Sequence, residues 1–220
     1  GEVGERVLGV GTGGSTGSSQ FGTYVFDGGS ISAGGLGNVS VTGTAGATSG
    51  FTKYGVYLNS NNASITSGGG NVTVTGIEGG SGAGTGFGFV SENTGAVTTA
   101  ANGGNVTVIA NSMLIGGPIS TNAAGQTTLR QNTNNVAIDL GDATDTKGGP
   151  LKLSDTELDL VTTGTLVIGN ANSGNITVSA AITRPANTSA RRAAKVAATS
   201  AVTMSRTVCS GQPVARRFLM

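Results

Sequence analysis

Short segments in which apolar and polar residues alternate recur along the chain. The clearest is residues 71–75 (NVTVT), whose valines and threonines point to opposite sides of an extended strand because side chains alternate with a period of two. The valine side is expected to be buried. Related strings occur at 37–43 (GNVSVTG), 104–110 (GNVTVIA) and 174–180 (GNITVSA).

The spacing of these strings indicates a repeat. Their opening asparagines are separated by 33, 34 and 70 residues, and the last interval is two periods of 35. Residues 135–139 (NVAID) are the expected degraded copy inside that double interval. Two further apolar runs precede each string, so one repeat contains three short strands separated by turns rich in Gly, Ser and Asn. The opening asparagines are Asn38, Asn71, Asn105 and Asn175.

This pattern predicts an all-β fold, a parallel β-helix (β-solenoid) of about five coils of roughly 34 residues with three short strands each. Helical repeats are excluded because Gly and β-branched residues dominate and no apolar stripe with helical spacing runs for two turns. Coils stacked about 4.8 Å apart would place equivalent residues in columns. The expected interior columns are Val39, Val72, Val106 and Ile176; Val41, Val74, Val108 and Val178; and Phe26, Leu58 and Val90.

Composition narrows the possible chemistry. The 220 residues include 40 Gly, no His and no Trp, and only 4% are aromatic and 10% charged. Without His, the chain cannot form a Ser/His/Asp triad, a Cys/His pair or an HExxH zinc site. The single cysteine, Cys209, excludes an internal disulfide framework. We therefore expect no enzyme activity, no catalytic residues and no cofactor.

Charge divides the chain into two parts. Residues 184–220 hold seven basic residues and no acidic one, whereas residues 1–183 hold five basic and eleven acidic residues. We interpret 1–183 as a β-solenoid segment that starts in mid-coil as a fragment, and 184–220 as a basic tail that is disordered or a non-native end. A nucleic-acid-binding arm is the less favoured alternative, so no nucleic-acid partner is expected. No long apolar run or signal-peptide pattern occurs, which predicts neither a membrane span nor an export signal in this fragment.

Six of the eleven acidic residues lie within 21 positions of the sequence. The simplest interpretation of this cluster is a solvent-exposed loop, and two functional interpretations are the alternatives. Clustered carboxylates can bind Ca²⁺ or act as a glycosidase pair. Their spacing fits neither an EF-hand nor the calcium-binding nonapeptide repeat, and a capping box from Ser154 to Glu157 accounts for part of the cluster. We therefore predict no metal site here. The residues are Asp139, Asp142, Asp145, Asp155, Glu157 and Asp159.

Two polar features of the repeat are expected on the outside. The opening asparagines, Asn38, Asn71, Asn105 and Asn175, can form a hydrogen-bonded ladder along the stack, which is a structural role. Hydroxyl side chains that alternate with the buried valines form a possible outward binding face. Regular Thr-x-Thr rows resemble ice-binding solenoids, although Thr is also an ordinary residue of exposed strands. The face consists of Ser40, Thr42, Thr73, Thr75, Thr107, Thr177 and Ser179.

The second half of the chain carries a family resemblance. Residues 153–159 (LSDTELD), 163–169 (TGTLVIG) and 174–178 (GNITV) resemble the repeat blocks of large bacterial exoproteins of the filamentous-haemagglutinin type, which are adhesins and autotransporter-like proteins. With the preceding GGNVTVTG strings, the likeness covers residues 1–183.

The resemblance implies a right-handed parallel β-helix, exported across the outer membrane of a Gram-negative cell with an outer-membrane secretion partner. It further implies a secreted or cell-surface location and adhesion to host or surface glycans or proteins. The expected function is thus that of a non-catalytic rod segment of an adhesin. An ice-binding solenoid and a polysaccharide-active β-helix enzyme are the alternatives.

Overall fold

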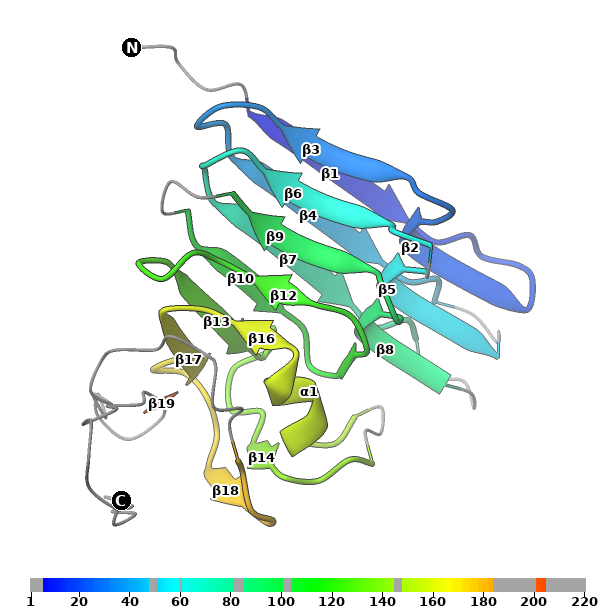
Figure 1. Ribbon diagram of the computed structural model, residues 1–220. Helices are drawn as coiled ribbons and strands as arrows, with labels where there is room; N and C mark the ends of the chain where they lie inside the picture. The colour runs from blue at the N-terminus through cyan, green and yellow to red at the C-terminus, as the bar shows by residue number, and fades with distance from the viewer. Residues whose placement is uncertain are drawn as a thin grey trace.

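The computed structural model describes residues 6–47, 51–59, 61–80, 85–100, 104–144, 148–183 and 201–204 (Figure 1). Sheet A contains β1 (Val7–Thr12), β4 (Val39–Thr44), β7 (Val72–Ile77), β10 (Val106–Ile109), β13 (Gln126–Arg130), β17 (Thr165–Gly169) and β19 (Ala201–Met204), in that order. Sheet B contains β11 (Met113–Ile115), β8 (Thr85–Ser91), β5 (Thr52–Leu58) and β2 (Ser19–Val25).

Two smaller groups of strands complete the fold. Sheet C contains β16 (Val161–Thr162), β12 (Ile119–Ser120), β9 (Ala96–Thr99), β6 (Ser64–Ser67) and β3 (Ser30–Ala33). Sheet D contains β15 (Leu151–Leu153), β14 (Ile138–Leu140) and β18 (Ile176–Val178). The short helix α1 (Asp155–Asp159) is the only helix in the described part of the chain.

Successive strands visit the three large sheets in turn. From β1 to β12 the chain runs through sheets A, B and C four times, and β13 returns to sheet A. Every strand pair is parallel except β17 with β19. The prediction of an all-β fold with parallel sheets is therefore confirmed, and the arrangement is compatible with a β-solenoid.

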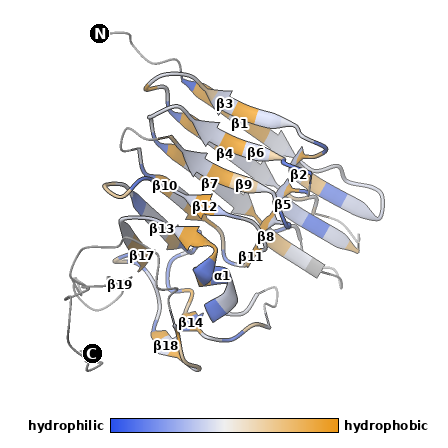
Figure 2. Ribbon diagram, in the orientation of Figure 1, coloured by the Kyte–Doolittle hydropathy of each residue, from blue (hydrophilic) through white to orange (hydrophobic). Residues whose placement is uncertain are grey.

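The valine columns predicted for the first repeats are present. Val72 lies in register between Val39 on β4 and Val106 on β10, and all three side chains are buried. Val41, Val74 and Val108 form a second column. Figure 2 shows the same periodicity as apolar positions that recur on successive strands of the stack. The hydrophobic core thus follows from alternation within each string and in-register pairing between strings.

The fourth string does not extend these columns, so the prediction for Ile176 and Val178 is wrong. Both residues lie on β18 in sheet D, where they pair with Ile138 and Leu140. The degraded copy expected at 135–139 therefore lies beside the fourth string, but outside sheet A.

Other residues continue the valine columns past β10. Thr127 and then Leu166 follow Val106, while Leu129 and then Ile168 follow Val108. The interval from Val106 to Thr127 is 21 residues and that from Thr127 to Leu166 is 39, so the repeat length changes here. The longer interval contains sheet D strands and α1. The prediction of a constant period of about 35 residues is therefore wrong beyond β10.

The third predicted column, of Phe26, Leu58 and Val90, is also wrong. Leu58 pairs with Val25 and Ser91, whereas Val90 pairs with Tyr57. Phe26 is 56% exposed. In these runs apolar residues occupy both faces of the strand, so alternation could not identify the buried face.

Glycines occupy the positions where the backbones of sheets A and B come closest to each other. A Cβ atom on Gly43 of β4 would overlap the carbonyl oxygen of Gly55 on β5. The next repeat has the same relationship, because a Cβ on Gly76 would overlap the carbonyl oxygen of Gly88. Backbone therefore lies directly on backbone, and only glycine fits. Close approach of the two sheets explains why few large side chains are needed inside.

Buried hydroxyl groups stabilise the turns that lead from sheet C back to sheet A. Ser67 Oγ donates a hydrogen bond to the carbonyl oxygen of Gly37 (2.6 Å) and accepts one from the N–H of Gly70 (2.8 Å). In the equivalent turn of the following repeat, Thr99 Oγ1 donates to the carbonyl oxygen of Gly104 (3.2 Å). These hydrogen bonds provide partners for backbone N–H and C=O groups of the turns that are buried away from water.

The basic tail expected at 184–220 lies almost entirely outside the described residues. Only Ala201–Met204 are described, and they form β19, which pairs with the last strand of the stack in sheet A. In the described part of the chain, no helix has both the length and the apolar character needed to cross a membrane.

Candidate functional site

The outer face of sheet B carries most of the aromatic side chains. The sequence has six Phe and three Tyr residues, and six of these nine lie together on β2, β5, β8 and the residue after β2. We call this group the aromatic strip. It consists of Phe21, Tyr24, Phe26, Tyr54, Tyr57 and Phe87.

The rings of the strip follow the strand register. Phe21, Tyr54 and Phe87 pair across β2, β5 and β8, with ring centroids 5.6 Å and 5.8 Å apart. Tyr24 pairs with Tyr57, and their nearly parallel rings are 5.0 Å apart. Phe21 joins the two rows through its 4.9 Å contact with Tyr24. Cross-strand pairing thus gives a continuous ring surface over three repeats.

A local irregularity places both rows on the same face. Tyr54 and Tyr57 are three positions apart, so strict alternation would point them in opposite directions. The strand pairing skips Gly55, however, and Lys53, Val56 and Leu58 all face the interior. The pairing skips the equivalent glycine on all three strands, so the register is kept while the alternation of faces is interrupted at this position. Both tyrosines therefore lie on the same face. Gly55, which contacts the backbone of sheet A, is thus also the position at which the alternation changes and the two tyrosines come to share a face.

The strip is most exposed at β2, the edge strand of sheet B. Phe26 is 56% exposed and Tyr24 is 43% exposed, whereas Tyr57 is only 8% exposed. Tyr24 contacts Phe26 by stacking, at 5.1 Å between centroids. The β2 end therefore presents ring surface to solvent, and contact with the buried ring of Tyr57 holds Tyr24 in place.

Polar groups border the strip at Tyr57. The Tyr57 hydroxyl donates to Glu92 Oε2 (2.8 Å) and accepts a hydrogen bond from Asn59 Nδ2 (2.7 Å). Burial, assisted by the Glu92 carboxylate, raises the pKa of Tyr57 to about 12. The phenol is therefore protonated at neutral pH and fixes the orientation of the carboxylate.

Lys53 is the one basic residue in the described parts of β2, β5 and β8, and it faces inward. Its side chain is 1% exposed and lies in register between Gln20 and Gly86. The ammonium nitrogen has no hydrogen-bond partner among the residues that the structure describes. The aromatic strip therefore has no exposed cation from these strands.

Sheet A brings together five of the seven hydroxyl residues predicted as an outward face. Ser40, Thr73 and Thr107 form one row, which Thr128 extends. The second row starts with Val10, contains Thr42 and Thr75, and continues with Ile109 and Arg130. These hydroxyl residues are only half exposed.

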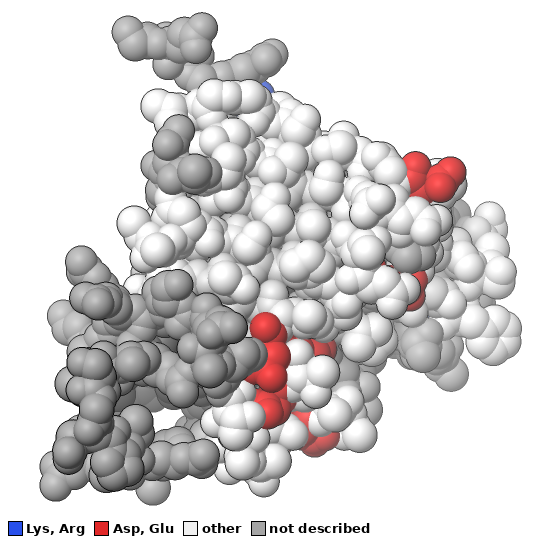
Figure 3. Space-filling model, viewed as in Figure 1, with Lys and Arg blue, Asp and Glu red and all other residues white. Residues whose placement is uncertain are grey.

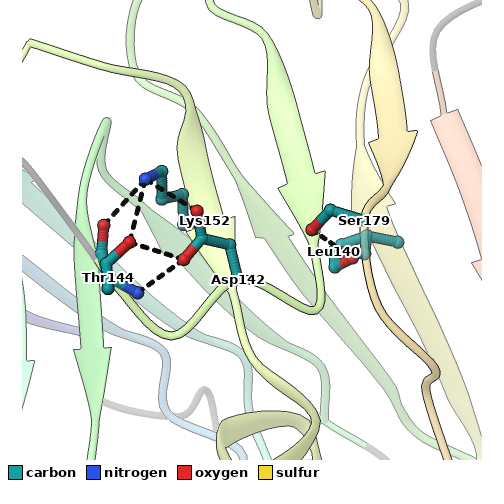
Figure 4. Close-up of polar contacts among 5 residues, drawn as sticks. All are labelled: Leu140, Asp142, Thr144, Lys152 and Ser179. Atoms are coloured by element: carbon teal, nitrogen blue, oxygen red, sulfur yellow. Dashed lines mark hydrogen bonds and ion pairs between the residues drawn. The ribbon is translucent and has the colours of Figure 1, made fainter.

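The remaining two predicted hydroxyl residues lie elsewhere. Thr177 is on β18 in sheet D, and Ser179 follows that strand. Ser179 Oγ donates a long hydrogen bond to the carbonyl oxygen of Leu140 (3.5 Å), as Figure 4 shows.

A longer hydroxyl row lies on sheet C and was missed in the sequence, although each of its members directly follows an Ile or Val. Thr98 Oγ1 donates to Thr66 Oγ1 (2.9 Å), and Ser64 Oγ donates to Ser30 Oγ beside it (2.9 Å). The row runs through Ser32, Thr66, Thr98, Ser120 and Thr162.

The asparagines at the start of β4, β7 and β10 form a row of hydrogen bonds along the stack. The Asn71 N–H donates to Asn38 Oδ1 (2.7 Å), and the Asn105 N–H donates to Asn71 Oδ1 (2.9 Å). Asn105 Oδ1 accepts from the N–H of Gln126 (2.8 Å). Each bond thus joins a side chain to the next backbone. Asn175 lies apart, beside sheet D, where its carbonyl oxygen accepts from Ile138.

Asp142 takes part in an ion pair near sheet D. Lys152 Nζ lies 2.9 Å from Asp142 Oδ2, and Thr144 donates to Asp142 through its N–H (2.8 Å) and its hydroxyl (2.6 Å) (Figure 4). The hydrogen-bonded ammonium group of Lys152, as the main cause, and the hydrogen bonds from Thr144, as the second, hold the pKa of the Asp142 carboxyl well below its usual range.

Three other acidic residues of the cluster, Asp155, Glu157 and Asp159, lie on α1, in the region where Figure 3 shows acidic side chains, and two of them have identified partners. Asp139 lies on β14 in sheet D. The predicted capping box is confirmed, since Ser154 and Glu157 bond reciprocally, and Glu157 Oε1 also accepts from the N–H of Ile115 (3.0 Å). Asp155 Oδ2 accepts from the hydroxyl of Thr183 (2.7 Å). Asp145 lies outside the described residues. Within the described ranges, no three His, Cys, Asp or Glu side chains are grouped so as to hold a metal ion.

Comparison with known proteins gives no match of any of three kinds. No family model matches the chain, no curated protein is significantly similar to it, and no solved structure is significantly similar to its fold.

Proposed function

We propose that this chain is a β-solenoid that serves as a non-catalytic attachment segment of a secreted or cell-surface adhesin of the filamentous-haemagglutinin type. The proposal includes about five coils and export by an outer-membrane secretion partner of a Gram-negative cell. Host or surface glycans and proteins would be its partners. The likeness of residues 153–178 to exoprotein repeat blocks supports the family assignment.

The observation that carries the proposal is the in-register repetition of outward side chains. The ring rows on sheet B and the hydroxyl rows on sheets A and C each gather residues that lie about one repeat apart in the sequence. A stack of parallel strands therefore presents the same chemical group several times on one rigid face. Such repetition favours multivalent attachment, in which weak contacts add through high effective concentration.

Density-dependent adhesion tests this function. Beads coated with the chain at high and low density are applied to epithelial cells, extracellular-matrix proteins and a panel of immobilised polysaccharides. We expect retention on at least one surface, rising more than linearly with coating density, without release of oligosaccharides. Lack of retention on every surface, or release of oligosaccharides, would contradict the proposal; the second result would favour a polysaccharide-active enzyme.

The hydroxyl row on sheet C favours one second candidate, an ice-binding solenoid. Five hydroxyl residues in register would be spaced regularly at the distance between strands, about 4.8 Å. Ice binding predicts thermal hysteresis that disappears when Thr98 at the centre of the row is replaced by Tyr. Ordinary freezing-point depression without hysteresis would exclude this candidate.

A further inference from the structure

We propose that the aromatic strip of sheet B is a binding site for an uncharged polysaccharide, whose pyranose rings stack on Tyr24 and Phe26. This inference rests on the attachment function and names the ligand class and the site. The juxtaposition that supports it is an exposed pair of stacked rings beside the polar group formed by Asn59, Tyr57 and Glu92.

The ring surface has the shape and chemistry that a sugar face requires. One face of many pyranoses is lined by C–H groups, which pack well on the electron-rich face of an aromatic ring. The row from Phe21 through Tyr54 to Phe87 spans two strand intervals, about 10 Å. Because the rings contact one another, they are held in place before ligand binding, which lowers its entropic cost.

The bordering polar groups provide hydrogen bonds to sugar hydroxyls. Glu92 Oε2 accepts from Tyr57, and a carboxylate has further acceptor sites on its two oxygens. A mainly aromatic surface with a few fixed polar groups is the usual composition of a small-ligand site.

Charge favours an uncharged ligand. Glu92 borders the strip, Asp27 directly follows Phe26, and Lys53 on β5 is buried in the interior. Residues 1–183 as a whole carry eleven acidic and five basic side chains. The acidic side chains of Glu92 and Asp27 would repel an anionic polysaccharide or a nucleic acid at this site.

The exposed area is too small for a stable protein interface formed by the rings alone. A Phe or Tyr side chain buries about 150–250 Å² when fully covered, so two half-exposed rings offer on the order of 200 Å² together. A typical protein interface needs about 800 Å² on each side. A sugar chain needs only a few rings, so it fits the available surface better.

Affinity electrophoresis tests the proposal. The chain is run in native gels containing a neutral polysaccharide (mannan, xyloglucan, dextran or β-glucan) or an anionic one (alginate or heparin). We expect retardation by at least one neutral polysaccharide and a tenfold or greater loss of affinity in the Tyr24→Ala/Phe26→Ala double variant. The matched control is Val10→Ala, which removes an exposed apolar side chain from β1 in sheet A and should leave retardation unchanged.

A measurement on the unmodified chain avoids dependence on the variants' folding. Saturation-transfer difference NMR with aromatic irradiation should give the strongest signals for the C–H protons of one face of a matching neutral hexasaccharide. Retardation by anionic polysaccharides alone, no retardation by any neutral one, or unchanged binding by a folded double variant would overturn the proposal. If that variant still adheres on beads, only the site assignment fails; if unmodified beads adhere to nothing, the attachment function fails as well.

Discussion

The ring of Tyr24 lies almost parallel to that of Tyr57 on the neighbouring strand, with centroids 5.0 Å apart and an 8° angle between the planes. Such a pair contributes about 0.5–1.5 kcal/mol beyond the burial of its surface. The same contact joins neighbouring repeats and orients the exposed ring of Tyr24. Stability of the stack and presentation of the strip are thus coupled at this pair.

Replacing Tyr57 by Phe should remove a pH dependence of stability. Because the folded-state pKa of about 12 lies above the ordinary value of about 10, the protonated phenol stabilises the fold. This contribution is complete below pH 10 and is lost as the pH rises towards 12. Thermal unfolding followed by circular dichroism between pH 8 and 12 should show a steeper loss for the unmodified chain than for Tyr57→Phe. Equal losses would contradict the assignment.

Replacing Gly43 by Ala should strongly destabilise the fold, by at least about 3 kcal/mol, because the new Cβ meets the backbone of Gly55 and neither strand can move aside. The matched control is Gly34→Ala, since a Cβ on Gly34 would have no atom within 4 Å. Urea unfolding should give a much lower midpoint for Gly43→Ala only. Similar midpoints for the two variants would show that the backbones of Gly43 and Gly55 are not in direct contact.

Replacing Lys53 by Met should stabilise the chain, because a buried ammonium group without a partner in the described structure loses its hydration on folding. Replacing a buried ion pair by apolar residues of similar volume is commonly neutral or stabilising by about 1–4 kcal/mol, and Lys53 has no described ionic partner whose attraction would be lost. We expect a rise in Tm of about 2–4 °C for each kcal/mol gained. Lys152→Met is the control, since it removes the ion pair with Asp142 and should not raise Tm. A lower Tm for Lys53→Met would indicate that Lys53 has an ionic partner.

Replacing Asn71 by Ala should cost about 1 kcal/mol, because the Asn105 N–H loses its acceptor in the row of hydrogen bonds. Asn175→Ala is the control, since Asn175 is exposed and outside the row. Chemical unfolding of both variants measures the difference. An equal effect at both positions would contradict a specific role of the row.

Alternation and repetition were sufficient to predict the first repeats. The strings around Val39, Val72 and Val106 are nearly identical, so both the buried face and the register could be derived from them. They were not sufficient after β10, because the repeat length changes there. Thr127 and Leu166 occupy the interior positions, but their strings share no motif with the earlier ones.

The aromatic strip was missed because simple alternation does not apply to it. Tyr54 and Tyr57 share a face only because the alternation of faces is interrupted at Gly55, a feature of the backbone that the strand pattern does not reveal. One signal was available: Phe21, Tyr54 and Phe87 are separated by 33 residues each, as are Tyr24 and Tyr57. Searching the repeat for aromatic positions would have found the strip.

The most direct test of the account is the position of Val72 relative to Val39 and Val106. NOE spectroscopy on a chain with labelled valine methyl groups, assigned by single Val→Ile variants, measures their proximity. In-register stacking predicts strong cross-peaks of Val72 with both Val39 and Val106, and none between Val39 and Val106, which are two strand intervals apart. Absence of either Val72 cross-peak would contradict in-register stacking of the repeats, on which the proposed rod, the aromatic strip and the hydroxyl rows depend.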